Sequence, residues 1–202
     1  MDFSSTPTAC PVPDINARIA LAIRTRRAAR KQSLEALASQ SGVSRSMLSL
    51  IERGESSPTA VVLEKIATAL GVPLASLFEP PGAPADPLSR QTDRQAWRDP
   101  DTGYQRWNVS PAGYPSPIQI VEVLFPPRAR VAFESAQRQP ALHQQIWVLE
   151  GRIDIMLGDR THSLQAGDCL AMRLHERITY HNRTTKPVRY AVIITKPWED
   201  SR

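Results

Sequence analysis

Residues 33–54, SLEALASQSGVSRSMLSLIERG, contain the pattern of two short helices joined by a tight turn. In each half, apolar residues recur at steps of three and four, which is the spacing of one helix face. These residues are Leu34, Leu37 and Ala38 in the first half, and Met47, Leu48 and Ile51 in the second. Ser33 and Ser44 precede the two runs, where a side-chain oxygen can accept hydrogen bonds from free N–H groups at a helix start. The stretch therefore predicts two helices with a turn at Ser41-Gly42-Val43.

The other face of the second predicted helix is polar and carries no carboxylate. It is made of residues at positions i, i+1, i+4 and i+8, namely Arg45, Ser46, Ser49 and Arg53. An Arg near the start of a helix can make a bidentate contact to guanine in the major groove, and Ser can donate or accept a hydrogen bond. Leu50, the apolar exception, can contact a thymine methyl. The pattern favours a helix that reads DNA bases, and the alternative is the solvated polar face that any helical hairpin has.

A run of basic residues without a single Asp or Glu precedes this unit. Its members are Arg18, Arg24, Arg26, Arg27, Arg30 and Lys31. The net charge of the 202-residue chain is only +5, so this positive charge is local. A local basic stripe is typical of a surface that binds phosphate groups, and the alternative is again a solvated helix face.

Helical spacing extends to both sides of the two-helix unit. Ile15, Ile19 and Ile23 predict a helix that Asp14 caps and that runs to about Lys31. A second amphipathic helix is predicted after the N-cap Thr59, with an end at Gly71. A last helical turn is expected over Leu74–Phe78, after Pro73.

The segment GVSRSMLSLIERGESSP, residues 42–58, resembles the helix-turn-helix of the lambda-repressor-like (XRE) regulators. The resemblance rests on the turn Gly42, the N-cap Ser44, the helix after it and the Glu52-Arg53-Gly54 ending, and it covers about 60 residues. It implies an all-α bundle of five helices whose Ser44–Arg53 helix enters the major groove of a double-stranded DNA operator. The residues expected to contact DNA are Arg24, Arg27, Lys31, Ser33, Leu34, Ser44, Arg45, Ser46, Ser49, Leu50, Arg53, Ser56 and Ser57.

Proline-rich stretches divide the chain into domains. Residues 1–13 predict a disordered tail, and residues 14–78 the helix-turn-helix domain. Residues 79–90, EPPGAPADPLSR, predict a semi-stiff linker to a second domain over residues 91–202.

The hydrophobic period changes from 3.6 to 2 in the second domain, with turn signals between the runs. The expected strands are 104–110, 118–125, 130–133, 143–149, 152–157, 169–173, 178–181 and 188–195. Many short strands with such spacing argue for an all-β sandwich or barrel.

The segment IWVLEGRIDIMLGDRTHSLQAGDCLAM, residues 146–172, and the later Tyr180-His181-Asn182 resemble a cupin. The resemblance covers roughly residues 104–196 and implies a small double-stranded β-helix, or jelly roll. In a regulator of this architecture, the cupin domain is expected to supply the dimer contact and to sense a ligand.

Many cupins hold a divalent metal with two His and a Glu from one motif and a His from a second. Counted from Gly151, the Glu position falls on Gln144, and the His positions fall on Arg138 and Pro140, or on Gln137 and Gln139. Counted from Gly167, the last position falls on Ile178. Amide and alkyl groups are poor metal ligands. We therefore expect no metal, no other cofactor and no catalytic residue. A new site built from His143, His175 and His181 is the alternative, but strand alternation points His143 away from Gln144.

The same positions suggest a polar effector pocket. Its candidate residues are Arg138, Gln144, Ile146, Arg173, His175, Ile178 and Tyr180. Such a pocket would suit a small anionic or amide-bearing molecule. The alternative is a barrel filled by its own side chains, with dimerisation as its only role.

These observations predict a cytoplasmic, homodimeric, sequence-specific DNA-binding transcriptional regulator that recognises a pseudo-palindromic operator. The chain has no signal-peptide pattern, no apolar run of membrane-spanning length and only two cysteines, Cys10 and Cys169, which lie far apart. Two other functions stay open: a cupin isomerase or dioxygenase fused to a DNA-binding head, and an antitoxin-like protein-interaction module.

Overall fold

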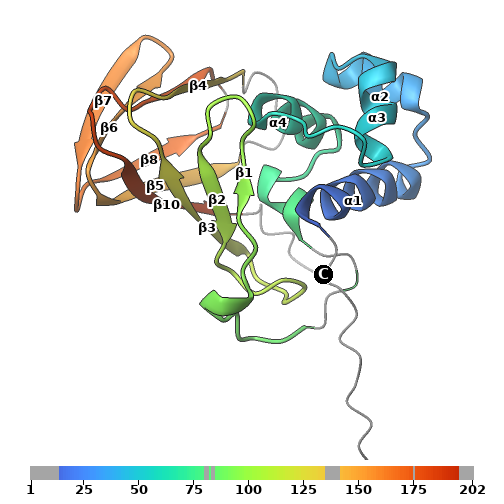
Figure 1. Ribbon diagram of the computed structural model, residues 1–202, viewed down its shortest axis with the longest axis horizontal. Coiled ribbons are helices and arrows are strands. Elements are labelled where there is room, and N and C mark those ends of the chain that lie inside the picture. Colours follow the sequence, from blue (N-terminus) through green and yellow to red (C-terminus); the bar gives the residue numbers. More distant parts are fainter. Residues whose placement is uncertain (1–13, 80–81, 83–84, 135–141, 175, 196–202) are drawn as a thin grey trace, which may run out of the picture.

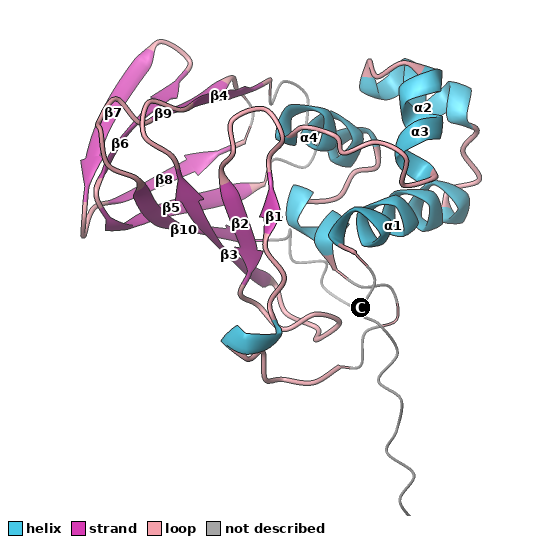
Figure 2. Ribbon diagram, in the orientation of Figure 1, coloured by secondary structure: helices cyan, strands magenta, loops and turns pink. Residues whose placement is uncertain are grey.

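The computed structural model describes residues 14–79, 82, 85–134, 142–174 and 176–195. Helices gather on one side of the molecule and strands on the other, as Figure 1 and Figure 2 show. The helical part consists of α1 (Ile15–Ala29), α2 (Leu34–Ser41), α3 (Arg45–Glu52), α4 (Ala60–Ala69) and the 3-10 helix η1 (Leu74–Phe78). The fifth predicted helix is therefore a 3-10 turn that follows four α-helices in the described part of the chain.

Each α-helix begins at a side-chain cap. Oxygens of Asp14, Ser33, Ser44 and Thr59 accept hydrogen bonds from backbone N–H groups two or three residues later. Helix α2 ends at Gly42, whose φ of 65° lies in the left-handed region that glycine adopts without steric cost. These caps explain why the predicted helix starts agree with the structure.

The helical core differs from the prediction at one position of α3. Leu48 and Ile51 are buried, but the side chain of Met47 is 38% exposed. Met47 lies about 100° around the helix axis from Leu48. Because α3 packs through the side that carries Leu48 and Ile51, Met47 falls on the exposed face.

The strands form two antiparallel sheets. The larger has the order β1-β2-β3-β10-β5-β8, and the smaller has the order β4-β9-β6-β7. The bounds are β1 (Trp97–Arg98), β2 (Gln105–Asn108), β3 (Ile118–Phe125), β4 (Arg130–Phe133), β5 (His143–Glu150), β6 (Arg152–Leu157), β7 (Arg160–Gln165), β8 (Cys169–Arg173), β9 (Ile178–His181) and β10 (Val188–Thr195). Alternate residues of β5 are buried, with Gln144, Ile146 and Val148 facing inward.

Two strands were not predicted. Strand β7 lies at the edge of the smaller sheet, pairs only with β6, and buries none of its residues completely. Its sequence RTHSLQ therefore lacks the apolar alternation that marks the other strands. Strand β1 has two residues, too few to show any period.

The helical domain packs directly on the larger sheet. The ring of Phe78 in η1 lies 5.3 Å from that of Trp97, and Asn108 donates a hydrogen bond of 2.9 Å to the Ala75 carbonyl. Gln119 of β3 donates another, of 2.7 Å, to Glu79. The two domains thus share an interface besides the chain that joins them. None of the described helices is long and apolar enough to span a membrane.

Candidate nucleic-acid interface and interior cavity

The exposed face of α3 is the first candidate site. Arg45 and Ser46 are exposed, Leu50 is 36% exposed, and Ser49 is half-buried beside them. Leu48 and Ile51 hold the opposite side of the helix in the core. Four of the residues predicted to read bases therefore lie together on one solvent-facing surface. Met47, which was not predicted to contact DNA, lies on the same surface.

Arg45 has a weak partner in the free protein. Its Nε lies 3.4 Å from a carboxylate oxygen of Glu35, and both side chains are largely exposed. Exposed ion pairs of this kind contribute little free energy. Arg45 can therefore exchange Glu35 for a base or a phosphate at small cost.

Arg53 is engaged more closely. It donates two hydrogen bonds of 2.8 Å to Glu55 and one to the hydroxyl of Ser49. These bonds raise the pKa of Arg53 and lower the pKa of Glu55. Arg53 and Ser49 must exchange these partners to contact DNA, which solvent makes easy at an exposed site.

The basic residues of α1 fall into two groups. Arg27 donates to both carboxylate oxygens of Glu52 at 2.7 Å and to the Gln32 carbonyl at 2.8 Å. The bonds to Glu52 raise the pKa of Arg27. This half-buried pair joins α1 to the end of α3, so Arg27 has a structural role and would have to exchange Glu52 to make the predicted phosphate contact.

Arg18 and Arg26 also serve the fold. Arg18 donates to Gln95 and to the Phe78 carbonyl, and Arg26 donates to the Ser76 carbonyl. Both therefore hold η1 against α1. Arg24 and Lys31, in contrast, are exposed.

The remaining predicted DNA contacts surround the two-helix unit. Ser33 and Ser44 are exposed N-caps, while Leu34 is half-buried against the core. Ser56 donates to the sulfur of Met47 at 3.8 Å, and Ser57 accepts a hydrogen bond of 3.1 Å from Asn16. The exposed serines stay candidates for phosphate contacts.

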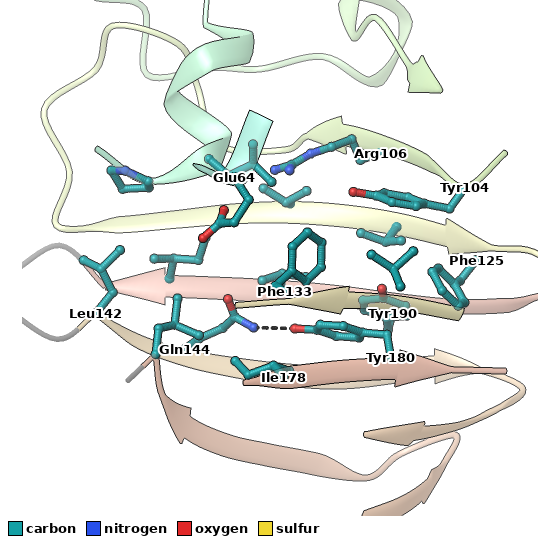
Figure 3. Close-up of a pocket in the computed structure, with 18 residues that line it drawn as sticks. Glu64, Tyr104, Arg106, Phe125, Phe133, Leu142, Gln144, Ile178, Tyr180 and Tyr190 are labelled. Atoms are coloured by element: carbon teal, nitrogen blue, oxygen red, sulfur yellow. Dashed lines mark hydrogen bonds between the residues drawn. The ribbon is translucent and has the colours of Figure 1, made fainter. Parts of the chain in front are cut away.

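The second candidate site is a cavity of about 80 Å³ between the two sheets. Its walls are largely apolar, and Glu64 of α4, Pro73 and Leu74 of η1 also line it (Figure 3). The polar or ionisable side chains that line it are Glu64, Tyr104, Arg106, Gln144, Tyr180 and Tyr190. Glu64 belongs to α4, so both domains contribute to this cavity.

The tyrosines in the cavity are neutral hydrogen-bonding groups. Burial raises the pKa values of Tyr104, Tyr180 and Tyr190. Gln144 donates a hydrogen bond of 2.8 Å to the Tyr180 hydroxyl, which Figure 3 marks. The Tyr180 and Tyr190 rings stack with 6.0 Å between their centroids.

Arg106 is the buried cation of the cavity, with 6% of its surface exposed. Its guanidinium carbon lies 4.4 Å from the centre of the Phe78 ring, and Tyr104 attracts the guanidinium electrostatically. Burial lowers the pKa of Arg106, while attraction to Tyr104 and Glu64 opposes that effect. Its Nε is buried and has no hydrogen-bond partner.

The predicted pocket residues have different places in the structure. Gln144, Ile178 and Tyr180 line the cavity, and Ile146 is buried next to it without lining it. Arg173 is exposed, because the alternation of β8 points Met172 inward and its neighbour outward. Arg138 and His175 lie outside the described residues.

Among the polar or ionisable lining residues, the prediction missed Glu64, Tyr104, Arg106 and Tyr190. A signal for Arg106 existed, because strand alternation places it on the same inward face as Tyr104. Glu64 had no such signal, since it is buried only through the contact between the two domains.

The two described residues at the family's metal positions, Gln144 and Ile178, do not fit a metal ion. The Gln144 amide is hydrogen-bonded to Tyr180, and Ile178 offers only an alkyl group. His143 is exposed on the opposite face of β5. Within the described ranges, no three His, Cys, Asp or Glu side chains are grouped closely enough to hold a metal. The remaining two positions lie among residues 137–140, outside those ranges.

Comparison with known proteins yields a match for each domain. Residues 23–77 match the family described as helix-turn-helix, and residues 122–194 match the cupin domain family. The HTH-type transcriptional regulator SutR of Escherichia coli (strain K12) is 27% identical over 172 residues, which are 82% of this chain and 87% of that protein. An HTH_3 family transcriptional regulator from Vibrio cholerae has a crystal structure that aligns with a TM-score of 0.73 at 26% identity, covering 91% of this chain and 98% of that one.

Both domains of the chain are thus matched in the same order. The alignment with the Vibrio cholerae structure spans both of them. The chain therefore combines a helix-turn-helix domain of the XRE type with a cupin domain that follows it, and over most of its length it is similar to transcriptional regulators.

Proposed function

We propose that this protein is a sequence-specific, DNA-binding transcriptional regulator that acts in the cytoplasm and whose cupin domain senses a small molecule. The observation that carries this proposal is the exposed face of α3, on which Arg45, Ser46 and Leu50 lie together. No acidic side chain of α3 itself interrupts this group, because Glu52 is turned toward Arg27.

In the proposed complex, α3 lies in the major groove. Arg45, Ser46 and Ser49 contact base edges, and Leu50 contacts a thymine methyl. Arg24, Lys31, Arg53, Ser33, Ser44, Ser56 and Ser57 contact the phosphates on either side. Base contacts then supply specificity, and phosphate contacts supply most of the affinity.

The cavity gives the cupin domain a route to the DNA-binding domain. Glu64 of α4 lines it, and Asp99 of the larger sheet's domain accepts a hydrogen bond of 2.7 Å from Ala60 N–H at the start of the same helix. If the ligand and the DNA each favour one placement of α4, each changes the affinity for the other by the same coupling free energy.

We propose a homodimer that binds a pseudo-palindromic operator. Two copies of α3 would enter successive major grooves about 34 Å apart. The dimer contact is assigned to the cupin domain.

An enzymatic role has less support. Cupin chemistry that relies on a metal needs the ligand positions that Gln144 and Ile178 occupy here. Metal analysis of the purified protein tests this: stoichiometric iron, manganese or zinc would contradict a metal-free sensor. Co-purification of a tightly bound protein partner would instead favour the protein-interaction alternative.

Arg45→Ala tests the proposed function. An operator is first selected from a pool of random DNA with the full-length protein. The variant should lose about 1–3 kcal/mol of discrimination at one base position, because one bidentate base contact is removed. Arg160→Ala removes an exposed charge from the far strand β7 and is the matched control. An unchanged ratio of operator to random-DNA affinity in Arg45→Ala would contradict the proposal for this residue.

A further inference from the structure

The interior cavity holds one basic and one acidic side chain, and they come from different domains. Arg106 belongs to β2 and Glu64 to α4. Both line the cavity and both are at least nine-tenths buried, with 6% and 9% of their surfaces exposed. They attract each other electrostatically.

Arg106 carries an unused donor in this cavity. Its Nε is buried without a hydrogen-bond partner, whereas its charge is met by the Phe78 ring and by Tyr104. A buried donor that finds no acceptor destabilises the folded protein. A ligand with a carboxylate oxygen would supply an acceptor for this guanidinium.

A carboxylate alone would be a poor ligand because of Glu64. The apolar walls, which include Leu74, Val121, Val123 and Leu142, keep the dielectric constant low. A lone anion would add a second negative charge close to Glu64, and a lone cation would add a second positive charge close to Arg106. A buried charge without a partner is costly. A ligand that brings one charge of each sign keeps the cavity balanced.

We propose that this cavity binds a small aliphatic α-amino acid, with its carboxylate at Arg106 and its ammonium group at Glu64. The inference rests on the proposed sensing role and names the class of effector. The apolar walls accommodate the aliphatic side chain, and the volume of about 80 Å³ restricts its size.

Such a ligand would bridge the two domains. Its ammonium group binds α4 of the DNA-binding domain, and its carboxylate binds β2, which Asn108 already joins to η1. Binding therefore favours one placement of α4 relative to the sheets. If operator binding also favours one placement of α4, the loaded and empty protein differ in DNA affinity.

The experiment is calorimetric titration of the full-length protein with three matched compounds. L-valine carries both charges, isovalerate lacks the ammonium group, and isobutylamine lacks the carboxylate. Glycine, L-alanine, L-leucine and L-methionine extend the series in side-chain size. We expect at least one of these amino acids to bind at one per chain, and valine to bind at least about tenfold more tightly than either analogue.

Glu64→Gln supplies the sharper readout. Without the Glu64 carboxylate, isovalerate no longer meets a like charge, so this variant should bind isovalerate more tightly than the unmodified protein and valine more weakly. Arg106→Gln should lose binding of both. Glu122→Gln removes a carboxylate outside the cavity and is the matched control. Thermal melts of each variant establish that it is folded.

Two results would overturn the inference: equal affinities for valine and isovalerate in the unmodified protein, or no binding by any amino acid of the series. Either result, obtained with protein that still binds its selected operator, would leave the proposed function intact. If the protein binds amino acids as expected but selects no operator, the proposed DNA-binding function fails and the amino-acid site stands.

Discussion

At the residue scale, the basic side chains of α1 divide by their partners. The sequence shows one uniform stripe, but the structure ties Arg18 and Arg26 to η1 and Arg27 to α3. Arg24 and Lys31 keep their charges exposed. The stripe therefore combines internal braces with candidate phosphate contacts, which composition cannot separate.

Arg27→Ala should lower the free energy of unfolding by about 1–3 kcal/mol, because it leaves the Glu52 carboxylate without its charged partner. The side chain of Glu52 is only 7% exposed, so water replaces that partner poorly. Urea denaturation measures the change, and Glu52→Gln in the same background shows whether the two residues act as a pair. If Arg27→Ala unfolds at the same urea concentration as the unmodified protein, the brace has no energetic role.

Arg24→Ala should act on DNA binding instead of stability. Arg24 lies one helical turn before Arg27, on the side of α1 that meets α3, and it is exposed. Removal of one phosphate contact should weaken binding to all sequences and reduce the salt slope by about 1. Affinities measured over a range of salt concentrations give that slope. A slope that does not change would place Arg24 away from the DNA.

At the element scale, α4 connects the two domains. The Thr59 hydroxyl and the Asp99 carboxylate both accept N–H groups of its first turn, at 3.4 and 2.7 Å. Asp99 is 2% exposed and also accepts two hydrogen bonds from Thr102. A carboxylate at a helix N-terminus is favoured by the helix dipole. The β1–β2 loop thus caps a helix of the other domain.

Asp99→Ala should loosen the start of α4 and lower stability by about 1–3 kcal/mol, since it removes a charged cap and leaves buried N–H groups unpaired. Hydrogen exchange followed by mass spectrometry should show faster exchange at the first turn of α4. Asp101→Ala, at an exposed position of the same loop, is the matched control. Equal exchange in the two variants would argue that the contact does not hold the domains together.

The helices and strands show which structural features the sequence patterns predict and which they do not. The start of every described α-helix and most strands were predicted, because caps and alternation are local. The exposure of Met47 was not predicted, because the side through which α3 packs depends on its contact with α1. The edge strand β7 was missed as well, since only its pairing with β6 makes it a strand.

At the scale of the whole molecule, the helical domain and the sheets form a shared interface around η1. Phe78 packs on Trp97 and below the guanidinium of Arg106, and Arg18 joins Gln95 to the same region. The placement of α3 is thereby linked to the cupin domain. In a dimer held by that domain, the spacing of two recognition helices would be restricted.

Operator spacing tests the proposed dimer. Insertion of about 5 base pairs between the half-sites turns one half-site to the opposite side of the DNA and should abolish cooperative binding. Insertion of about 10 base pairs returns both half-sites to the same side of the DNA and should recover part of the cooperative binding. Gel-shift titrations measure both, and binding that ignores the 5-base-pair insertion would contradict a dimer with fixed spacing.

Local patterns in this chain were enough to indicate a helical segment followed by a segment of short strands, and the resemblance of two motifs to known families implied the helix-turn-helix and the cupin fold. They depend on caps, turns and periodicity, which involve residues a few positions apart. The cavity could not be inferred in the same way. Glu64 and Arg106 are far apart in the chain and meet only because η1 packs on the larger sheet and α4 packs beside β4 of the smaller one. Burial gives them their chemistry, and burial is a property of the assembled domains.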